Sequence, residues 1–257
     1  MDLKKHNEKA WDRLVEKGDG WTVPVSAEEV EKARDGEWDI VLTPTKPIPK
    51  NWFPSLKGKN VLCLASGGGQ QGPILAAAGA NVTVFDQSNN QLAQDQYVAE
   101  RDGLKIQTVQ GSMDDLSVFE DCAFDLIIHP VSNVFIEDVL PVWKEAFRVL
   151  KPGGSLLSGS SNPLLYIFSE DQMDQGNLIV EHSIPYSDVK NLSKEKLEIL
   201  KDDHAPFQFG HTLEDLIQGQ ISAGFMIAGF YEDNFGGKMV LDQYINSFFA
   251  TKAVKFN

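Results

Sequence analysis

Residues 61–72 read Val61-Leu62-Cys63-Leu64-Ala65-Ser66-Gly67-Gly68-Gly69-Gln70-Gln71-Gly72, and this stretch decides the fold. An apolar run typical of a buried strand breaks into glycines, and a second apolar run then ends on Asp86. Glycines let the backbone turn tightly and approach a ligand where a Cβ would collide. The carboxylate at the end of the second strand can accept hydrogen bonds from ribose hydroxyls. The order predicts a βαβ unit that binds an adenosine-containing cofactor.

The glycine loop by itself leaves two chemistries open. It satisfies G-x-G-x-x-G, the dinucleotide fingerprint, and Asp86 follows Gly67 by about 20 residues, the spacing found in NAD sites. An NAD-dependent oxidoreductase and a methyltransferase both use this layout. Other parts of the sequence are needed to distinguish between these two classes of enzyme.

Composition narrows the class of protein. The chain has 257 residues, 42% of them hydrophobic, which is enough for one large α/β domain with a buried core. No apolar run is long enough to cross a membrane, no secretory signal is visible, and the two cysteines lack metal-ligand spacing, so we expect a cytoplasmic protein without a metal site. A net charge of −14 argues against nucleic acid and favours a neutral or cationic small substrate.

The chain is expected to form one domain with two additions. Residues 1–56 are interpreted as an N-terminal helical cap and linker: helical spacing covers 6–17, Ser26 and Glu29 predict a capping box, and four prolines follow between positions 44 and 54. Residues 57–257 form the core. An insert at about 162–210 interrupts it, with a predicted hairpin at 178–186 and a charged helix at 193–201.

Within the core, strands alternate with helices. Strands are predicted at 60–64, 81–85, 106–110, 124–129, 155–158, 225–231 and 248–254, and helices at 71–78, 88–101, 141–150 and 212–224. This alternation predicts a doubly wound, mostly parallel, seven-stranded α/β sheet, with the N-terminal cap and the insert after strand five covering its carboxyl edge.

The sequence after the third strand resembles one family. Gln110–Leu116 forms a polar turn, Phe147–Gly154 reads F-R-V-L-K-P-G-G, and Thr212–Phe225 follows the pattern of a helix and strand near the end of the domain. In these stretches the chain resembles the class I S-adenosylmethionine-dependent methyltransferases, over about 57–160 and again over 212–255. The resemblance implies methyl transfer from S-adenosylmethionine to a small-molecule acceptor, leaving S-adenosylhomocysteine. The chain departs from it at Cys63, usually an acid, and at Ala65, usually glycine.

The resemblance also implies a set of site residues. Gly67 and Gly69 are expected beside the methionine part of the cofactor, Asp86 on the ribose and Met113 on the adenine. The full cofactor-binding set is Ala65, Ser66, Gly67, Gly69, Gln71, Asp86, Gln87, Ser88, Ser112, Met113, Asp114 and His129. Gln70, Gln71 or a residue of the cap is expected to replace the missing acid at Cys63.

The acceptor side is less defined by sequence. His129 lies at the carboxyl end of the fourth strand, near the expected methyl group, and is the candidate general base or a residue lining the pocket. Tyr166, Tyr186 and His211 in and after the insert are candidates for substrate binding, although aromatic residues there could instead form the insert's own core. A non-catalytic S-adenosylmethionine-binding protein stays open as an alternative. The acceptor, the methylated atom and the oligomeric state are left open.

Overall fold

A seven-stranded sheet forms the centre of the protein in a computed structural model that describes residues 2–256. The strand order is β3-β2-β1-β4-β5-β9-β8, and β9 runs antiparallel to both of its neighbours. The strands are β1 (Asn60–Leu64), β2 (Asn81–Asp86), β3 (Ile106–Gln110), β4 (Phe124–His129), β5 (Leu150–Ser161), β8 (Phe225–Asp233) and β9 (Phe248–Lys255). The predicted doubly wound, mostly parallel sheet is confirmed.

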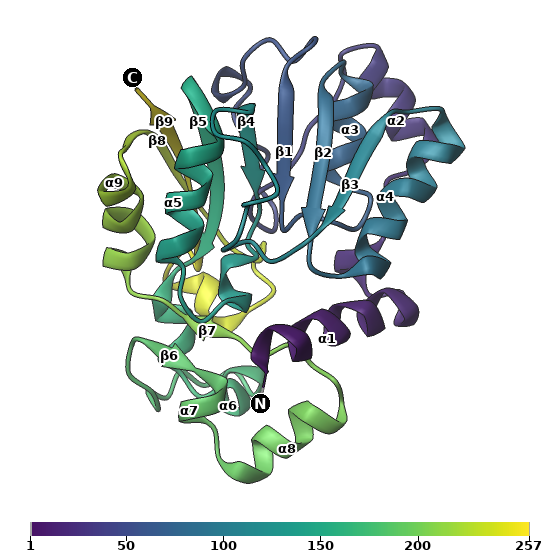
Figure 1. Ribbon diagram of the computed structural model, residues 1–257. Helices are drawn as coiled ribbons and strands as arrows, with labels where there is room; N and C mark the ends of the chain where they lie inside the picture. The colour runs from purple at the N-terminus through teal and green to yellow at the C-terminus, as the bar shows by residue number, and fades with distance from the viewer. Residues whose placement is uncertain (1, 257) are drawn as a thin grey trace.

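Helices cover both faces of this sheet (Figure 1). One face carries α2 (Ala27–Arg34), α3 (Gln71–Ala77) and α4 (Asn89–Asp102), and the other carries α5 (Leu140–Val149) and α9 (Gly219–Ala223). Side chains alternate along β1, so Val61 and Cys63 join the first hydrophobic cluster while Leu62 and Leu64 join the second. Burial on both faces explains why β1 is apolar without interruption.

Local sequence signals set the ends of several helices. Ser88 accepts a hydrogen bond from Gln91 N–H and caps α4, which ends at Gly103 with φ 64°. Ser26 and Glu29 form the predicted capping box of α2. The element after Thr212 differs from the single predicted helix: a π-helical turn, Glu214–Gln218, precedes α9.

The N-terminal segment packs onto the main sheet. Helix α1 (Leu3–Lys17) crosses below the carboxyl ends of β1, β2 and β3 in Figure 1. After α2 the chain returns to the core, where Ile40, Leu42 and Ile48 are buried in the same cluster as β1. The segment therefore contributes to the hydrophobic core and reaches the edge of the sheet where ligands bind in open α/β folds.

The insert after β5 forms a second layer below the same edge (Figure 1). Its elements are α6 (Glu170–Asp174), β6 (Tyr186–Ser187), α7 (Asp188–Asn191), α8 (Lys194–Asp202) and β7 (Phe209–Gly210). Helix α8 confirms the predicted charged helix. The predicted hairpin at 178–186 is wrong: Val180 makes a single bridge with Phe168, and β6 pairs with β7 instead.

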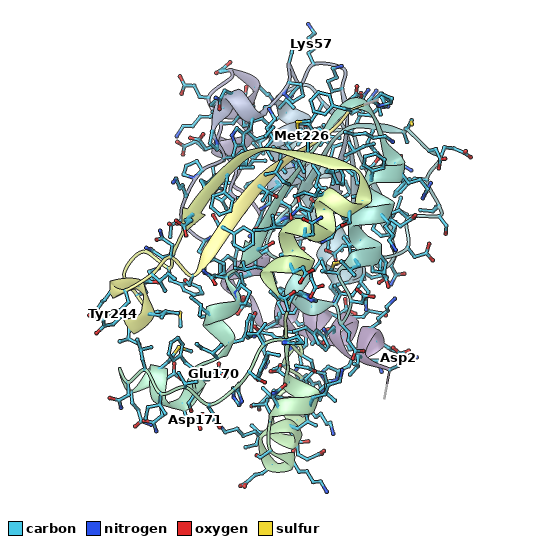
Figure 2. All side chains as sticks on the ribbon, turned by 90° about the vertical axis from the view of Figure 1, so that its left-hand side faces the viewer. Asp2, Lys57, Glu170, Asp171, Met226 and Tyr244 are labelled. Carbon is cyan, nitrogen blue, oxygen red and sulfur yellow. The ribbon has the colours of Figure 1, made fainter. Side chains whose placement is uncertain are left out.

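The insert and the loop before β9 lie together at one end of the molecule. In Figure 2, Lys57 and Met226 lie at the end opposite to Glu170, Asp171 and Tyr244, which mark the insert and the loop before β9. In the part of the chain that the structure describes, no helix is long and apolar enough to cross a membrane.

Candidate active site

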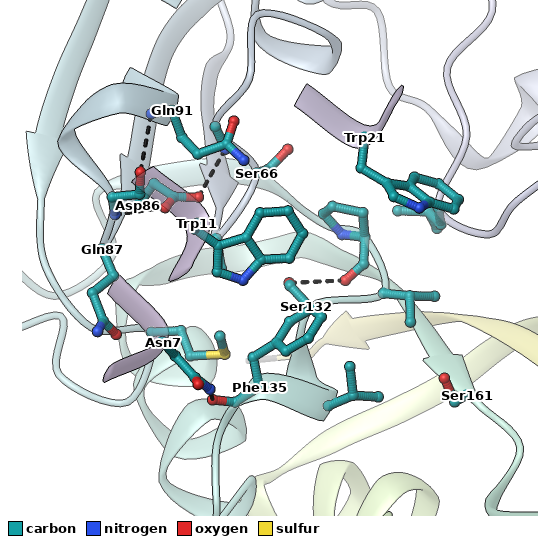
Figure 3. Close-up of a pocket in the computed structure, with 18 of the residues that line it drawn as sticks. Asn7, Trp11, Trp21, Ser66, Asp86, Gln87, Gln91, Ser132, Phe135 and Ser161 are labelled. Carbon is teal, nitrogen blue, oxygen red and sulfur yellow. Dashed lines mark hydrogen bonds between the residues drawn. The ribbon is translucent and has the colours of Figure 1, made fainter. Parts of the chain in front are cut away.

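A cavity of about 330 Å³ opens where α1, the carboxyl ends of the strands and the insert meet. This size lies within the range of small-molecule sites. Figure 3 shows Trp11 in its middle, with Asp86 and Gln87 on one side and Ser161 on the other. The lining comprises Asn7, Glu8, Trp11, Trp21, Val41, Leu42, Thr43, Pro44, Ala65, Ser66, Gly67, Gln70, Gln71, Asp86, Gln87, Ser88, Gln91, Gly111, Met113, Pro130, Val131, Ser132, Val134, Phe135, Ser161, Leu165, Tyr166, Gln208, Phe235 and Phe248.

Asp86 at the end of β2 presents a carboxylate to this cavity. One oxygen accepts a 2.9 Å hydrogen bond from Gly67 N–H, and the other accepts one of 2.9 Å from Ser88 N–H. Burial raises the pKa of Asp86 and outweighs the lowering effect of these hydrogen bonds. An ionised carboxylate offers about four acceptor positions, so two remain free for a ligand. This fits a pair of ribose hydroxyls.

The glycine loop is shaped for close approach. A Cβ on Gly67 would lie 2.7 Å from Gln91 Cβ and 3.2 Å from Asp86 Cβ, so a side chain there would push the loop out of place. Gly68 and Gly69 have φ angles of 117° and 71°. Ala65 precedes them with φ 47°, in the left-handed region that favours glycine, and it lines the cavity.

The predicted replacements for the acid at Cys63 hold the loop to the N-terminal segment. Gln70 Nε2 donates hydrogen bonds to the carbonyls of Trp21, at 3.2 Å, and Val23, at 3.1 Å. Gln71 accepts a hydrogen bond of 3.1 Å from the Ser66 hydroxyl. Gln70, Gln71 and Ser66 all line the cavity. The cap and the glycine loop therefore form one wall.

The turn after β3 supplies part of the expected adenine position. Gly111 and Met113 line the cavity, and Met113 packs against the core. Ser112 and Asp114 do not line it. The Ser112 hydroxyl bonds to Asp114 at 2.5 Å, and Asp114 forms a 2.6 Å ion pair with Lys4. Asp114 therefore fastens α1 to the turn.

Helix α1 closes the cavity with an aromatic residue. Trp11 meets Phe135 edge to face, with ring centroids 5.0 Å apart. Behind them, Asn7 Nδ2 donates 3.0 Å hydrogen bonds to the carbonyls of Phe135 and of Phe207 in the insert. Sequence pattern indicated that Trp11 lies on a helix of the cap, but Phe135 lies in a short 3-10 turn and carries no motif.

The insert contributes one of the three predicted substrate residues directly. Tyr166 lines the cavity, and its hydroxyl donates to Gln208 at 3.0 Å. Tyr186 stacks behind Tyr166 with centroids 5.4 Å apart, and its hydroxyl donates to Asp188. His211 is buried with Nε2 2.9 Å from the carbonyl of Asn133. Tyr186 and His211 therefore support the wall without lining the cavity.

His129 does not lie in the cavity lining, which corrects its expected place there. Its side chain is fully buried, with Nδ1 2.9 Å from the Leu64 carbonyl and its ring edge to face with Trp143. A carbonyl can only accept, so Nδ1 carries the proton. Burial lowers the pKa of His129 to about 4. The enclosed ring has no contact with the cavity, and the general-base role of His129 stays a prediction that a pH profile can test.

Comparison with known proteins decides the family. A family model described as "Methyltransferase domain" matches residues 62–158. Over 253 residues, 98% of each chain, the protein is 59% identical to "Uncharacterized methyltransferase YbaJ" of Bacillus subtilis. The chain belongs to the class I S-adenosylmethionine-dependent methyltransferases. It is therefore a methyltransferase with S-adenosylmethionine as cofactor and S-adenosylhomocysteine as product.

More distant relatives agree with this assignment. The chain is 32% identical to the 2-phytyl-1,4-beta-naphthoquinone methyltransferase of Arabidopsis thaliana, over 74% of this chain and 73% of that one. Its fold matches a putative methyltransferase from Listeria monocytogenes with a TM-score of 0.63 at 19% identity, over 81% of this chain and 95% of that one. Two alternatives are set aside: the NAD-dependent oxidoreductase, which the glycine loop left open, and the non-catalytic binding protein, which the departures at Cys63 and Ala65 left open.

Proposed function

We propose that this methyltransferase acts on a small, neutral and largely apolar acceptor, whose nucleophilic atom attacks the methyl group without help from a protein base. The observation that carries this proposal is the aromatic part of the cavity lining, which we assign to the acceptor. Two pairs of its rings, Trp11 with Phe135 and Phe235 with Phe248, meet edge to face, and Tyr166 and Trp21 line the same cavity. Rings contribute large apolar contact area and suit flat acceptors. The name of the Arabidopsis relative contains a naphthoquinone, which is a flat and uncharged ring system.

The charge of the lining supports a neutral acceptor. Among the described residues that line the cavity, the charged ones are Glu8 and Asp86, and none is Lys, Arg or His. An acceptor with a carboxylate or phosphate would lose its water without gaining a cationic partner there, which is costly. The sulfonium of the cofactor, by contrast, suits an acidic wall.

The lining also bears on how the acceptor becomes a nucleophile. No histidine lines the cavity in the described part of the chain. Burial raises the pKa of the Tyr166 hydroxyl, which donates a hydrogen bond to Gln208. S-Adenosylmethionine supplies a methyl group already activated by its sulfonium. The protein is then needed to orient the acceptor and exclude water, with Trp11 and Tyr166 as walls. The acceptor is proposed to attack the methyl group through its own lone pair: the methyl–sulfur bond breaks, S-adenosylhomocysteine leaves, and any proton on the attacking atom is lost to solvent before or after transfer.

For the cofactor itself, we propose that the cavity holds the residues that bind it. Asp86 would hold the ribose, Gly67 and Ser66 would lie beside the methionine part, and Met113 would pack on the adenine. Ala65, Gln71, Gln87 and Ser88 share the same wall. Gly69, Ser112 and Asp114 would act from behind this wall, because they do not line it.

Transfer of a labelled methyl group tests the proposal. The acceptors share one naphthalene ring that carries a hydroxyl, an amino or a thiol group, and each is paired with the same ring bearing an added carboxylate. We expect product from at least one neutral ring, and at least about tenfold less from its carboxylated partner, because an unpaired buried charge costs several times RT. The three nucleophiles report which atom accepts the methyl group.

Two results would count against the proposal. Faster transfer to the carboxylated ring than to the neutral one would show that the lining tolerates an anion. Failure of every neutral ring, with saturable cofactor binding and transfer to a peptide or an RNA instead, would replace the small acceptor by a macromolecule.

A further inference from the structure

Asp95 is a buried acid that the cavity does not use directly. Asp95 lies on α4, is fully buried and does not line the cavity. One carboxylate oxygen, Oδ2, accepts hydrogen bonds from Gly68 N–H and Gly69 N–H, both at 3.1 Å. The carboxyl group of Asp95 therefore binds two consecutive amides of the glycine loop without lining the cavity.

Burying Asp95 in this way costs free energy of folding. The other oxygen, Oδ1, is buried and makes no hydrogen bond to the described residues. A Cβ on Gly72 would lie 2.9 Å from this oxygen, so the neighbouring helix is packed tightly against it. Burial raises the pKa of Asp95 to about 8 and outweighs the lowering effect of the two amides. A buried polar atom without a partner costs free energy, so a role beyond packing is needed to explain the acid.

The loop is the part of the molecule that most needs such a support. Gly68 and Gly69 both have positive φ, a backbone that glycine adopts readily. Besides Asp95, the Gln91 carbonyl accepts a 3.1 Å hydrogen bond from Gly68 N–H, and Val25 N–H donates to the Gly69 carbonyl at 2.9 Å, whereas Gly69 N–H bonds to Asp95. Gly67, one residue earlier, donates to Asp86, the acid at the cavity. A shift at Gly68 would therefore move the amide that orients Asp86.

We propose that Asp95 is a positioning residue that fixes the Gly68–Gly69 turn in the shape required to receive S-adenosylmethionine. It acts through the loop, because it lies behind the wall that the ligand contacts. The inference concerns the cofactor only, so it does not depend on which acceptor the enzyme methylates.

Calorimetric titration with S-adenosylmethionine and with S-adenosylhomocysteine, without any acceptor, tests this role. Asp95→Ala removes both hydrogen bonds, and we expect it to weaken both ligands by about tenfold or more, the equivalent of two lost hydrogen bonds to a charged or polar oxygen. Asp95→Asn keeps an oxygen that can accept from the same two amides. It should bind both ligands within about threefold of the wild type, since its geometry is preserved.

A matched control separates positioning from stability. Glu100→Gln removes an exposed carboxylate from the same helix and should leave ligand binding unchanged. Melting temperatures are measured for all variants. Ligand affinity in Asp95→Ala equal to that of the wild type would overturn the proposal. Equal loss of affinity in the Asn and Ala variants, in step with lower melting temperatures, would overturn it as well, because it would show a structural role.

A measurement on the unchanged protein covers the case in which Asp95→Ala fails to fold. Amide hydrogen exchange of Gly69 should be slow in the ligand-free wild type, because this amide is buried and hydrogen-bonded to Asp95. Gly68 is less informative, because its amide also donates to the Gln91 carbonyl. Exchange at Gly69 as fast as in an exposed loop would show that Asp95 does not hold the turn.

Discussion

Asp12 in α1 accepts a 2.6 Å hydrogen bond from the hydroxyl of Ser88, the residue that caps α4. The same carboxylate oxygen accepts from Asn90 N–H at 3.1 Å. Two helices that are far apart in the sequence thus share one capping group at the edge of the cavity. Because Ser88 also donates its amide to Asp86, the N-terminal helix is linked to the acid that we propose for the ribose.

The first prediction concerns this link. Asp12→Ala removes the acceptor for Ser88 and for Asn90, and should lower stability by about 1 kcal/mol, the usual effect of losing a cap. Cofactor affinity should fall as well, because Asp12 holds Ser88, whose amide donates to Asp86, the residue that we propose for the ribose. Thermal unfolding and cofactor titration measure the two effects. Unchanged affinity would show that α1 does not need this contact to close the site.

Asp86 gives the second prediction. Asp86→Asn keeps an oxygen for Gly67 N–H but removes the charge and the free acceptor positions that we assign to the ribose. Hydrogen bonds to charged groups contribute about 1.5–3 kcal/mol, so affinity for S-adenosylmethionine should fall by roughly ten- to a hundredfold. S-Adenosylhomocysteine, which has the same ribose, should lose a similar factor. A loss confined to S-adenosylmethionine would place Asp86 near the sulfonium instead.

Much of the fold could be predicted because its signals are local. The strand at residues 60–64, the glycines after it and the cap at Ser88 are all encoded within a few residues of where they act. The F-R-V-L-K-P-G-G stretch then separated two families that share a glycine loop. Strand β5 was predicted too short, as 155–158, because Pro152 and Gly153 suggested a turn inside what the structure extends to Leu150–Ser161.

The strand pairing in the insert could not be predicted from local sequence. The hairpin predicted at 178–186 fits alternation in sequence, yet Tyr186 finds its partner in Gly210, across α7 and α8. Pairing between residues that far apart is set by packing and not by a turn. The same limit applies to Phe135, which meets Trp11 only because α1 folds back over the sheet.

Asp95 was missed although a signal existed. It falls between Leu92 and Val98 on the buried side of α4, a place where an acid is rarely found without a partner. The resemblance pointed to a missing acid at Cys63 on β1 and directed attention to Gln70 and Gln71. The structure places a carboxylate at the loop from a helix further along the chain.

The third prediction concerns Trp11, which Figure 3 shows in the middle of the cavity. Trp11→Ala removes the ring that packs edge to face on Phe135 and opens the acceptor side to water. The KM for an apolar acceptor should rise by roughly tenfold or more, since aromatic contacts contribute about 1 kcal/mol beyond the area they bury. Trp11→Phe is the matched control and should recover most of the loss. A fall in kcat without a change in KM would place Trp11 at the reacting atoms instead.

The last prediction is a pH dependence that involves His129. Its folded pKa is about 4, below the ordinary value of 6.5, because burial disfavours the charged ring. Between about pH 6.5 and pH 4, His129 is protonated in the unfolded chain but neutral in the folded protein. The free energy of unfolding therefore decreases as the pH falls through this range. The full effect is of the order of 3 kcal/mol, from 1.36 kcal/mol for each pKa unit.

His129→Asn tests both consequences of this burial. The variant lacks the titrating ring, so the loss of stability between pH 6.5 and pH 4 should be smaller than in the wild type, as measured by chemical denaturation at each pH. Because the wild-type ring is neutral above about pH 5, the pH profile of kcat between 5.5 and 8 should keep its shape in the variant. Loss of a limb near pH 6.5 in His129→Asn would restore His129 as a general base.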